Sequence, residues 1–414
     1  MDSSSNQMLT IVRDSHKAAI KLAQISGEKR RLGVIALAKA MESSFDEILE
    51  ANTLDLELSR EMAIADPIAD WLKLTPERLE MTVSILKQLS TASDPNKRLI
   101  NAPYQIESAQ TYCQLIPLGT IALIHEAFPE LAAIAAGMCL KTGNSLITRG
   151  CSTASNSNQV IANLLQQAIA NEDLPENSLS HISPDLGISV QDLVTQDRYL
   201  NLVIPYGRPS LVQQVAEKAT ATVLKTTIGN CYLYLSLSGD LELTRRVIID
   251  SHDGQPDAVN AIEKVLLNQD IKSSTLHSLF NTLQQQGFDL RGDEVLLEQF
   301  PEYLTLVQPE EWSRSYLSKT ISFRYVESLS QGIFWINRYS SGHADCIVTE
   351  SYQESRQFVQ GIDSAVVYIN TSPKFSRNPE GSRNVFLGVS NQKGYRQGLI
   401  NMETFTTIKQ VVQG

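Results

Sequence analysis

The segment from Pro117 to Gly150 contains the residues whose types and spacing best suit a ligand-binding turn. Its small, apolar helical stretch ends in Lys141-Thr-Gly-Asn144, where Gly143 suits the left-handed position that follows a helix. A lysine at such a turn can reach a ribose or phosphate at the carboxyl edge of a parallel sheet, where open α/β sheets bind ligands. Alternatively, Lys141 only neutralises the helix dipole. The residues alone leave both interpretations open.

Other chemical signatures are missing from the sequence. No P-loop, glycine-rich dinucleotide fingerprint, HExxH or GxSxG motif occurs. The 6 histidines include no pair spaced to share one helix face, and the 5 cysteines are odd in number with no CxxC. The sequence therefore predicts no metal site and no disulfide framework.

Composition indicates a globular protein of two or three domains. The chain has 414 residues, of which 42% are hydrophobic and 20% charged, so a substantial core is expected. With 35 basic against 46 acidic residues the net charge is −11, and the basic residues are scattered, which argues against nucleic acid as a partner. Neither a secretory signal nor an apolar stretch able to cross a membrane is evident, so a reduced, cytoplasmic protein without membrane contact is expected.

The elements that would position these residues follow an α/β pattern. The first hundred residues show helical spacing, with one well-marked start where Thr75 caps, Pro76 takes the first position and Glu77 favours the helix dipole. After a strand or hairpin over 105–115, strand 119–124, helix 131–140 and strand 145–148 predict a right-handed crossover in a parallel sheet. A helix over 158–170 and a strand over 199–205 extend a doubly wound domain.

The alternation begins again after Asp250 and predicts a second α/β domain. Its expected strands are 264–267, 322–326, 346–348 and 365–369, and its expected helices are 274–286 and 352–360. No solenoid repeat and no Gly/Ser-rich linker separates the two halves.

The pattern PLGxIxxIxEAxPxxxxxAxxxCLKTGNxxIxRG closely resembles the glutamate-5-semialdehyde dehydrogenases, or γ-glutamyl phosphate reductases, of the aldehyde dehydrogenase superfamily. Collinear matches extend over nearly the whole chain. They include DWLKLTPERLE from Asp70, YLNLVIPYG from Tyr199, HADCIVTE from His343 and AVVYINTS from Ala365.

The resemblance implies a cofactor-type α/β domain over 1–104 and 119–249. It also implies a catalytic-type α/β domain over 250–387 and an oligomerisation element over 105–118 and 388–414. The implied reaction, in proline biosynthesis, is NADPH-dependent reduction of L-glutamate 5-phosphate to L-glutamate 5-semialdehyde with phosphate release, through a cysteine thioacyl enzyme. Lys141, Gly143 and Asn144 would bind the cofactor, with Lys141 on its adenosine side. The implied partners are the small-molecule substrate, a second copy of the chain in a homo-oligomer, or glutamate 5-kinase.

The sequence departs from the family pattern at the reaction centre. The family stretch QRPSTCNTxExLLV matches residues 255–267 and places Val259 at the nucleophile, beside Asn260. Phe386 takes the position of a glutamate that holds the nicotinamide ribose in the family, and Thr226-Thr-Ile-Gly229 replaces a glycine-rich turn. No catalytic residue is therefore assigned.

Three functional hypotheses follow from these departures. The chain is a working reductase with an unrecognised nucleophile, a non-catalytic relative that binds a partner or senses a ligand, or the same fold adapted to other chemistry such as ester hydrolysis. For the third, His252 and Asp253 are the candidate pair, but adjacent residues face opposite ways on a strand. Among the cysteines Cys151 is the best substitute thiol, although it lies on the expected cofactor side.

Overall fold

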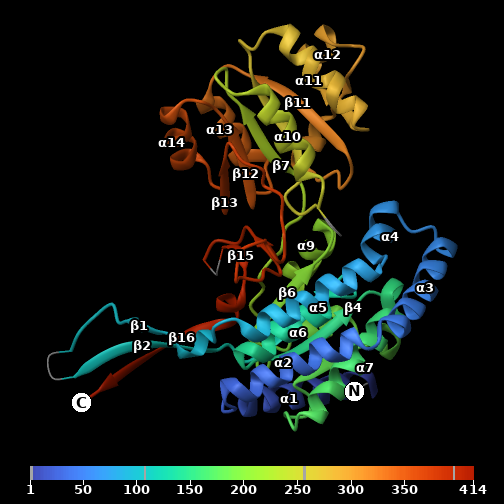
Figure 1. The fold of residues 1–414 in the computed structure, drawn as a ribbon, viewed down its shortest axis with the longest axis vertical. Helices are drawn as coiled ribbons and strands as arrows, with labels where there is room; N and C mark the ends of the chain where they lie inside the picture. Colours follow the sequence, from blue (N-terminus) through green and yellow to red (C-terminus); the bar gives the residue numbers. More distant parts are fainter. Residues whose placement is uncertain (1–2, 107–108, 255–257, 395–396) are drawn as a thin grey trace. The chain divides into compact units, whose positions relative to one another are not determined.

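A computed structural model describes residues 3–106, 109–254, 258–394 and 397–414. The chain forms two compact units (Figure 1). Unit 1 comprises Met1–Thr226, Arg377–Leu387 and Ile400–Gly414, and unit 2 comprises Thr227–Ser376 and Gly388–Leu399.

Unit 1 is built on a four-stranded sheet in the order β5-β4-β3-β6. Every pairing in this sheet is parallel, and β3 contacts both β4 and β6. Continuous burial of β3 explains its unbroken apolar sequence, because helices cover a parallel sheet on both faces. The predicted strand–helix–strand crossover is thus confirmed. The elements are β3 (Thr120–His125), α6 (Leu131–Thr142), β4 (Ser145–Gly150), α7 (Ser155–Asn171), β5 (Leu179–His181), α8 (Val190–Val194), β6 (Leu202–Tyr206) and α9 (Pro209–Lys218).

The described residues before the sheet are mainly helical, as the spacing of the first hundred residues predicts. The helices are α1 (Ser3–Leu22), α2 (Gly27–Glu42), α3 (Phe45–Glu61), α4 (Asp66–Leu72) and α5 (Pro76–Thr91). The expected start of α5 is confirmed, since the Thr75 side chain accepts a hydrogen bond from the Arg78 N–H and Pro76 opens the helix. On one face of the sheet, Met8 and Val12 of α1 pack with Val203 of β6 in a common core.

A three-stranded ribbon of order β1-β2-β16 also belongs to unit 1 (Figure 1). Its strands are β1 (Leu99–Asn101), β2 (Gln110–Pro117) and β16 (Thr406–Gln413). The central strand β2 pairs antiparallel with β16 over its whole length, from Thr406 opposite Pro117 to Gln413 opposite Gln110. This ribbon matches the hairpin and C-terminal strand of the expected oligomerisation element, but β14 (Gly388–Ser390) pairs with β15 (Gly398–Ile400) instead.

Unit 2 is a seven-stranded sheet of order β10-β9-β11-β8-β7-β12-β13. Its strands are β7 (Cys231–Leu235), β8 (Ile262–Asn268), β9 (Asp289–Gly292), β10 (Thr305–Leu306), β11 (Thr320–Val326), β12 (Ala344–Val348) and β13 (Val366–Ile369). Its helices are α10 (Leu241–Ser251), α11 (Ser273–Gln285), α12 (Glu294–Gln299), α13 (Leu329–Tyr339) and α14 (Tyr352–Gly361).

Alternation along the strands divides the core of unit 2 between two faces. Leu233 and Val265 pack against α10 and α11, whereas Tyr232 and Leu266 pack against α13 and α14. The expected domain boundary at 249/250 differs from the structural boundary at 226/227. The reason is β7, which pairs with β8 and β12 inside this sheet, so the chain enters unit 2 before it forms β7.

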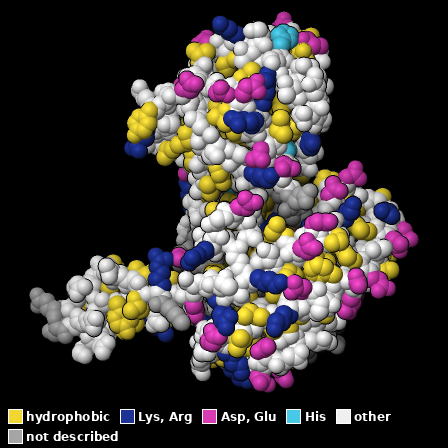
Figure 2. All heavy atoms as spheres, viewed as in Figure 1, with side chains coloured by type: hydrophobic (Ala, Val, Ile, Leu, Met, Phe, Trp, Pro, Cys, Tyr) yellow, Lys and Arg dark blue, Asp and Glu magenta, His cyan; other side chains and the backbone are white. Residues whose placement is uncertain are grey.

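Acidic and basic side chains are interspersed on the face of the molecule shown in Figure 2. Within the described part of the chain, no helix is long and apolar enough to cross a membrane.

Candidate active site

The nucleophile position of the family falls just before β8 in unit 2. Val259 is 1% exposed, and its carbonyl oxygen accepts hydrogen bonds from the Gly229 N–H at 2.8 Å and from Nε2 of His343 at 2.9 Å. The neighbouring Asn260 donates its amide to the Pro373 carbonyl at 2.8 Å. The aligned residues 255–257 lie outside the described residues. The valine side chain offers no lone pair, so residue 259 cannot form an acyl intermediate.

One thiol does lie beside this position. The Sγ of Cys231 is 3.4 Å from the same His343 Nε2 that contacts the Val259 carbonyl. Cys231 is fully buried, and burial raises the pKa of its thiol well above the ordinary value. Burial also lowers the pKa of His343 to about 4, so the imidazole is neutral near pH 7. Because the thiolate is the nucleophilic form, this Cys–His contact is a structural one.

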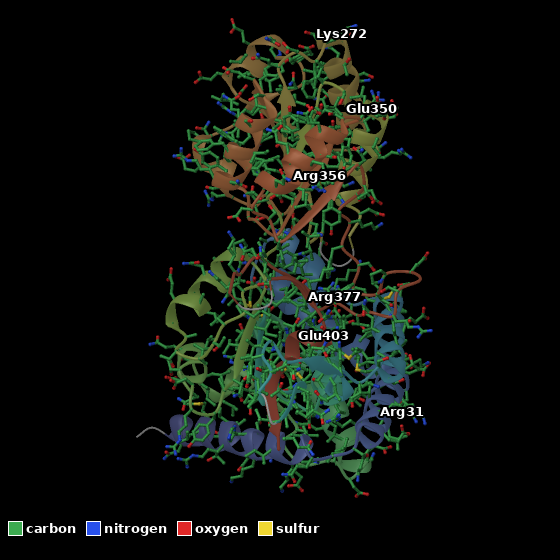
Figure 3. All side chains as sticks on the ribbon, turned by 90° about the vertical axis from the view of Figure 1, so that its left-hand side faces the viewer. Arg31, Lys272, Glu350, Arg356, Arg377 and Glu403 are labelled. Carbon is green, nitrogen blue, oxygen red and sulfur yellow. The ribbon has the colours of Figure 1, made fainter. Side chains whose placement is uncertain are left out.

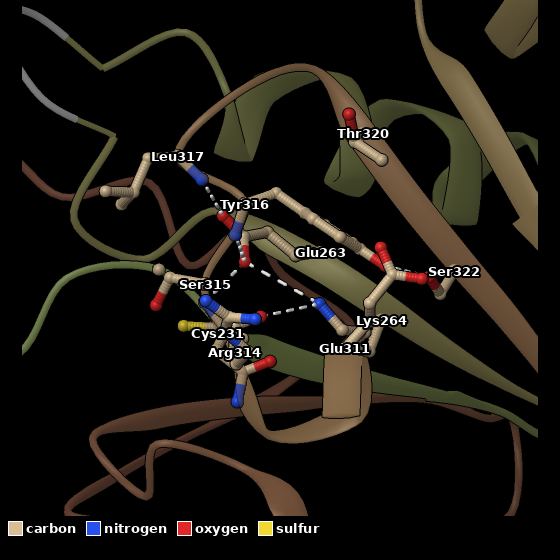
Figure 4. A network of polar contacts seen from close by, with 12 residues as sticks. Cys231, Glu263, Lys264, Glu311, Arg314, Ser315, Tyr316, Leu317, Thr320 and Ser322 are labelled. Atoms are coloured by element: carbon tan, nitrogen blue, oxygen red, sulfur yellow. Dashed lines mark hydrogen bonds and ion pairs between the residues drawn. The ribbon is translucent and has the colours of Figure 1, made fainter. Parts of the chain in front are cut away.

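A buried acid–base pair, Glu263 and Lys264, lies in β8 shortly after Val259 in the chain (Figure 4). The Glu263 carboxylate accepts hydrogen bonds from the backbone N–H groups of Asn230, Tyr316 and Leu317, at 2.9, 2.8 and 2.9 Å. Lys264, which is 0% exposed, places Nζ 3.2 Å from the Arg314 carbonyl and 3.7 Å from the centroid of the Tyr316 ring. These contacts fix the loop after η4 (Pro309–Ser313) against β8. Their role is structural, because the two side chains satisfy three backbone N–H groups and one backbone carbonyl of the adjoining loops.

The turn before β7 packs closely against Glu263. Gly229 has φ +71°, and a Cβ there would lie 2.9 Å from a Glu263 carboxylate oxygen. Two residues earlier, the Thr227 N–H donates to the Val389 carbonyl at 3.1 Å. The backbone of this turn therefore forms hydrogen bonds and close packing contacts within unit 2.

The carboxyl edge of the unit 1 sheet carries a different set of residues. Glu126 follows β3, and its carboxylate accepts three hydrogen bonds from Arg208, which follows β6: from the backbone N–H at 2.9 Å, Nε at 3.0 Å and Nη2 at 2.6 Å. Hydrogen bonding to Glu126 raises the pKa of Arg208 further. The two strands adjoin, and helices leave them after the carboxyl ends. This is the topological position where open α/β sheets bind ligands.

Two buried side chains at this edge have no partner among the described residues. Both ring nitrogens of His125 and both amide atoms of Asn158 lack hydrogen bonds, although each residue is only 2% exposed. Gly150 separates them, since a Cβ there would lie 2.0 Å from the Asn158 amide nitrogen and 3.3 Å from the His125 ring. Burial lowers the pKa of His125 to about 3, so its ring offers one donor and one acceptor at neutral pH. Buried polar groups normally have partners, so this edge has spare hydrogen-bonding capacity.

Two further cations and a thiol complete this edge. Arg149, the residue before the last of β4, donates Nη1 to the Gly150 carbonyl at 2.6 Å, while its buried Nε has no partner among the described residues. Arg377, labelled in Figure 3, donates Nη2 to the Tyr206 hydroxyl at 2.6 Å. The Sγ of Cys151 accepts from the Ala127 N–H at 3.3 Å, as expected for a thiol placed after β4.

The Lys141 turn lies at the opposite edge, because α6 returns the chain to the amino end of β4. Its residues form hydrogen bonds within the chain. Lys141 is 4% exposed, and its Nζ donates to the Ser90 carbonyl at 2.8 Å. Gly143 caps α6 with φ +81°, and Asn144 accepts from the Gly119 N–H at 2.8 Å and donates to the Phe405 carbonyl at 2.9 Å. The expectation that Lys141 reaches the carboxyl edge is wrong, because a helix-to-strand turn in a parallel α/β unit lies at the amino edge.

The remaining departures also take structural positions. Phe386 is partly buried and donates its N–H to the Arg377 carbonyl at 2.9 Å. The Thr226 hydroxyl donates to the Pro205 carbonyl at 2.7 Å. The sequence interpretation did not single out Arg208, Asn158 or His343 as functional residues. A usable signal existed for Arg208, since it is the first charged residue after a buried strand.

Comparison with known proteins agrees with this architecture. The model of the aldehyde dehydrogenase family matches residues 1–285. The chain is 54% identical to γ-glutamyl phosphate reductase 2 of Synechocystis sp., covering 100% of this chain and 98% of that protein. The chain belongs to the γ-glutamyl phosphate reductase family. It is also 35% identical to the γ-glutamyl phosphate reductase of Gloeobacter violaceus, over 100% of this chain and 99% of the relative.

Solved structures show the same relationship. The γ-glutamyl phosphate reductase of Thermotoga maritima matches with a TM-score of 0.89 at 29% identity, over 98% of each chain. An acetylating aldehyde dehydrogenase from Geobacillus thermoglucosidasius matches with a TM-score of 0.71 at 14% identity, over 99% of this chain and 97% of that one. The second match shows the shared fold alone, and both confirm the aldehyde-dehydrogenase-like α/β architecture.

Membership in this family implies a nicotinamide cofactor, and the carboxyl edge of unit 1 fits such a group. Its unpartnered amide and imidazole atoms match the hydroxyls of a ribose, and Arg149 supplies a cation for a phosphate. The arginine at position 208 is already bonded to Glu126, so a phosphate there would have to compete with a carboxylate.

Proposed function

We propose that this chain is a nucleotide-binding, non-catalytic member of the γ-glutamyl phosphate reductase family. The observation that carries the proposal is Val259, an apolar and buried side chain at the position of the family nucleophile. The only thiol in contact with this centre in the described chain, Cys231, is held protonated by burial. Reduction of L-glutamate 5-phosphate through a thioacyl enzyme needs a thiolate that accepts the acyl group, and this position supplies none.

The proposed nucleotide is NADPH, which in the family supplies hydride. His125 and Asn158 would bind it by hydrogen bonds, and Arg149 would hold its negative charge. His125 is neutral near pH 7 and donates or accepts without adding charge. These residues replace Lys141, Gly143 and Asn144 as the proposed cofactor contacts, because the latter are bonded within the chain at the other edge of the sheet.

In this proposal the nucleotide-bound protein acts by binding, with glutamate 5-kinase, an active reductase subunit or a second copy of the chain as the partner. The exposed strand β16 supports self-association, since Ile408 and Val412 are 52% and 49% exposed along an edge strand. A cytoplasmic location is part of the same proposal.

Two measurements test the function together. Nicotinamide fluorescence or calorimetry should show saturable NADPH binding by the intact chain, weakened at least tenfold in Arg149→Gln. Arg60→Gln, an exposed arginine at the end of α3, serves as the control. The same protein should give no semialdehyde oxidation in the reverse direction. Turnover by the wild-type chain would overturn the non-catalytic assignment, and a lack of binding would overturn the nucleotide assignment.

The Val259→Cys variant separates loss of the nucleophile from wider loss of the site. We expect no turnover from this variant, because Phe386 replaces the ribose-binding glutamate of the family and Thr227 replaces a turn glycine. Appreciable turnover would show that only the thiol is missing and that the cofactor side is intact.

A further inference from the structure

Unit 2 contains a cavity of about 740 Å³ whose lining includes neither Val259 nor the residues bonded to its carbonyl. It runs along α10, where Leu243, Arg246, Val247, Ile249 and Asp250 line it. The other walls come from the residues after α10, before β9, before β11 and after β13: His252, Asp253, Gln286, Phe288, Lys319, Asn370, Thr371 and Ser372. Its volume is in the range of small-molecule sites, roughly 300 to 1,000 Å³.

Two cations in this cavity have no counter-ion. Within the described residues, the side chains of Arg246 and Lys319 make no hydrogen bond or ion pair, and Lys319 has only a long contact, 5.7 Å from Nζ to the Phe288 ring centroid. The chain has 46 acidic side chains for 35 basic ones, so unpaired cations facing one cavity are unexpected. The adjacent Arg245 shows the usual behaviour, because it pairs with Glu242 and contacts Ser278.

Lys374 pairs with both acidic residues of the cavity, so Arg246, Lys319 and Lys374 give three positive charges against the two carboxylates. Lys374 places Nζ 2.7 Å from an Asp253 carboxylate oxygen and 3.5 Å from one of Asp250. His252 is bonded through Nε2 to the Ile262 carbonyl at 2.9 Å, and its ring packs edge-on against Phe288 at 4.9 Å. The charge left for a ligand is therefore positive, above an apolar wall of Val247 and Phe288.

We propose that this cavity binds a small organic phosphate, with Arg246 and Lys319 holding the phosphate and Val247 and Phe288 contacting an apolar body. Two cations match a dianion better than a monocarboxylate, and the hydroxyls of Thr371 and Ser372 add hydrogen-bonding groups. A free phosphate ion would fill only a small part of the volume. The cavity lies along the end of α10, and the Ser251 hydroxyl of this helix accepts a hydrogen bond from the Ile262 N–H at the start of β8, at 3.1 Å. A ligand in the cavity would therefore contact the helix that is bonded to β8. This goes beyond the nucleotide binding proposed for unit 1.

Phenyl phosphate is the probe for this proposal, with inorganic phosphate and benzoate as the comparison anions. Calorimetry on the intact chain should show saturable binding of phenyl phosphate, at least tenfold tighter than inorganic phosphate or benzoate. Arg246→Gln and Lys319→Gln should each weaken it about tenfold, and the double variant should abolish it. Arg245→Gln is the matched control on the same helix and should leave binding unchanged.

Each alternative outcome decides the question. Equal binding of inorganic phosphate and phenyl phosphate would replace the organic ligand with a free phosphate site. Tightest binding of benzoate would overturn the phosphate assignment. No binding, or equal loss in Arg245→Gln, would overturn the site. Both substituted residues are exposed, so the variants are expected to fold. NADPH titration of the same variants should be unaffected, which separates this site from the proposed function.

Discussion

The carboxyl edge of the unit 1 sheet and the nucleophile position of unit 2 differ in how fully their polar groups are used. Around Val259, the carbonyl oxygen, His343 and the Glu263 carboxylate have partners within the chain, whereas the amide oxygens of Asn230 and Asn260 have none among the described residues. At the unit 1 edge, His125 and Asn158 are as deeply buried but have no hydrogen bonds among the described residues. At the unit 1 edge two whole side chains lack partners, so this edge has more unused hydrogen-bonding capacity than the region around Val259. This contrast underlies the proposed function, in which the unit 1 edge binds the nucleotide and no reaction takes place at Val259.

Removing the Glu263 carboxylate should give the largest change in stability. Glu263→Ala leaves three backbone N–H groups, that of the buried Asn230 among them, without an acceptor and Lys264 without its ion-pair partner. We expect a loss of about 3 to 5 kcal/mol in the free energy of unfolding, measured by urea denaturation. The exposed Glu350→Ala, labelled in Figure 3, is the control and should change it by less than about 0.5 kcal/mol. A loss below about 1 kcal/mol would contradict the view that this centre is structural.

Acid should destabilise both regions through their buried histidines. The folded-state pKa is lowered to about 3 for His125 and about 4 for His343, against an ordinary value of 6.5. The unfolded chain therefore binds protons that the folded chain does not. This contribution to stability is complete above pH 6.5 and is lost as pH falls towards 4, at roughly 1.4 kcal/mol per pH unit for each histidine.

Thermal denaturation across pH 4 to 7 tests this dependence. His125→Asn should reduce its slope by about one proton. An unchanged slope in His125→Asn would show that this imidazole is not held neutral in the fold.

A double-mutant cycle tests whether Glu263 and Lys264 act as one unit. The carboxylate oxygen and Nζ are 3.8 Å apart, and both side chains are 0% exposed. Lys264→Met alone leaves the carboxylate without a counter-ion, so the double variant Glu263→Ala/Lys264→Met should cost about 1 to 3 kcal/mol less than the sum of the single variants. Strict additivity of the unfolding free energies would show that the two groups are independent.

Replacing the unpartnered histidine at the unit 1 edge should have the smallest effect on stability. His125→Leu removes a buried polar ring that has no hydrogen bond to lose, so the free energy of unfolding should change by less than about 1 kcal/mol. NADPH affinity should nevertheless fall, as measured by fluorescence titration. A large loss of stability would mean that His125 has a structural partner and would remove the contrast between the two regions.

Much of the fold could be predicted from residue patterns because the signals were local. The Thr75 cap, the burial of β3 and the crossover through α6 follow from side-chain spacing and from the length of apolar runs. The domain boundary could not be predicted in this way. Strand β7 has the same apolar character as the strands of unit 1, and only its pairing with β8 and β12 assigns it to unit 2.

For the candidate site too, some features follow from the sequence and others only from the tertiary structure. The sequence by itself determined the family and the valine at residue 259, because residue identity decides whether a nucleophile exists. Only the tertiary structure decided that Lys141 lies at the amino edge of its sheet and that Arg208 meets Glu126 across adjoining strands. It also decided that Cys231, 28 positions before Val259 in the chain, shares a histidine with it. Such relations depend on strand order and on the direction of each connection, which residue spacing does not encode.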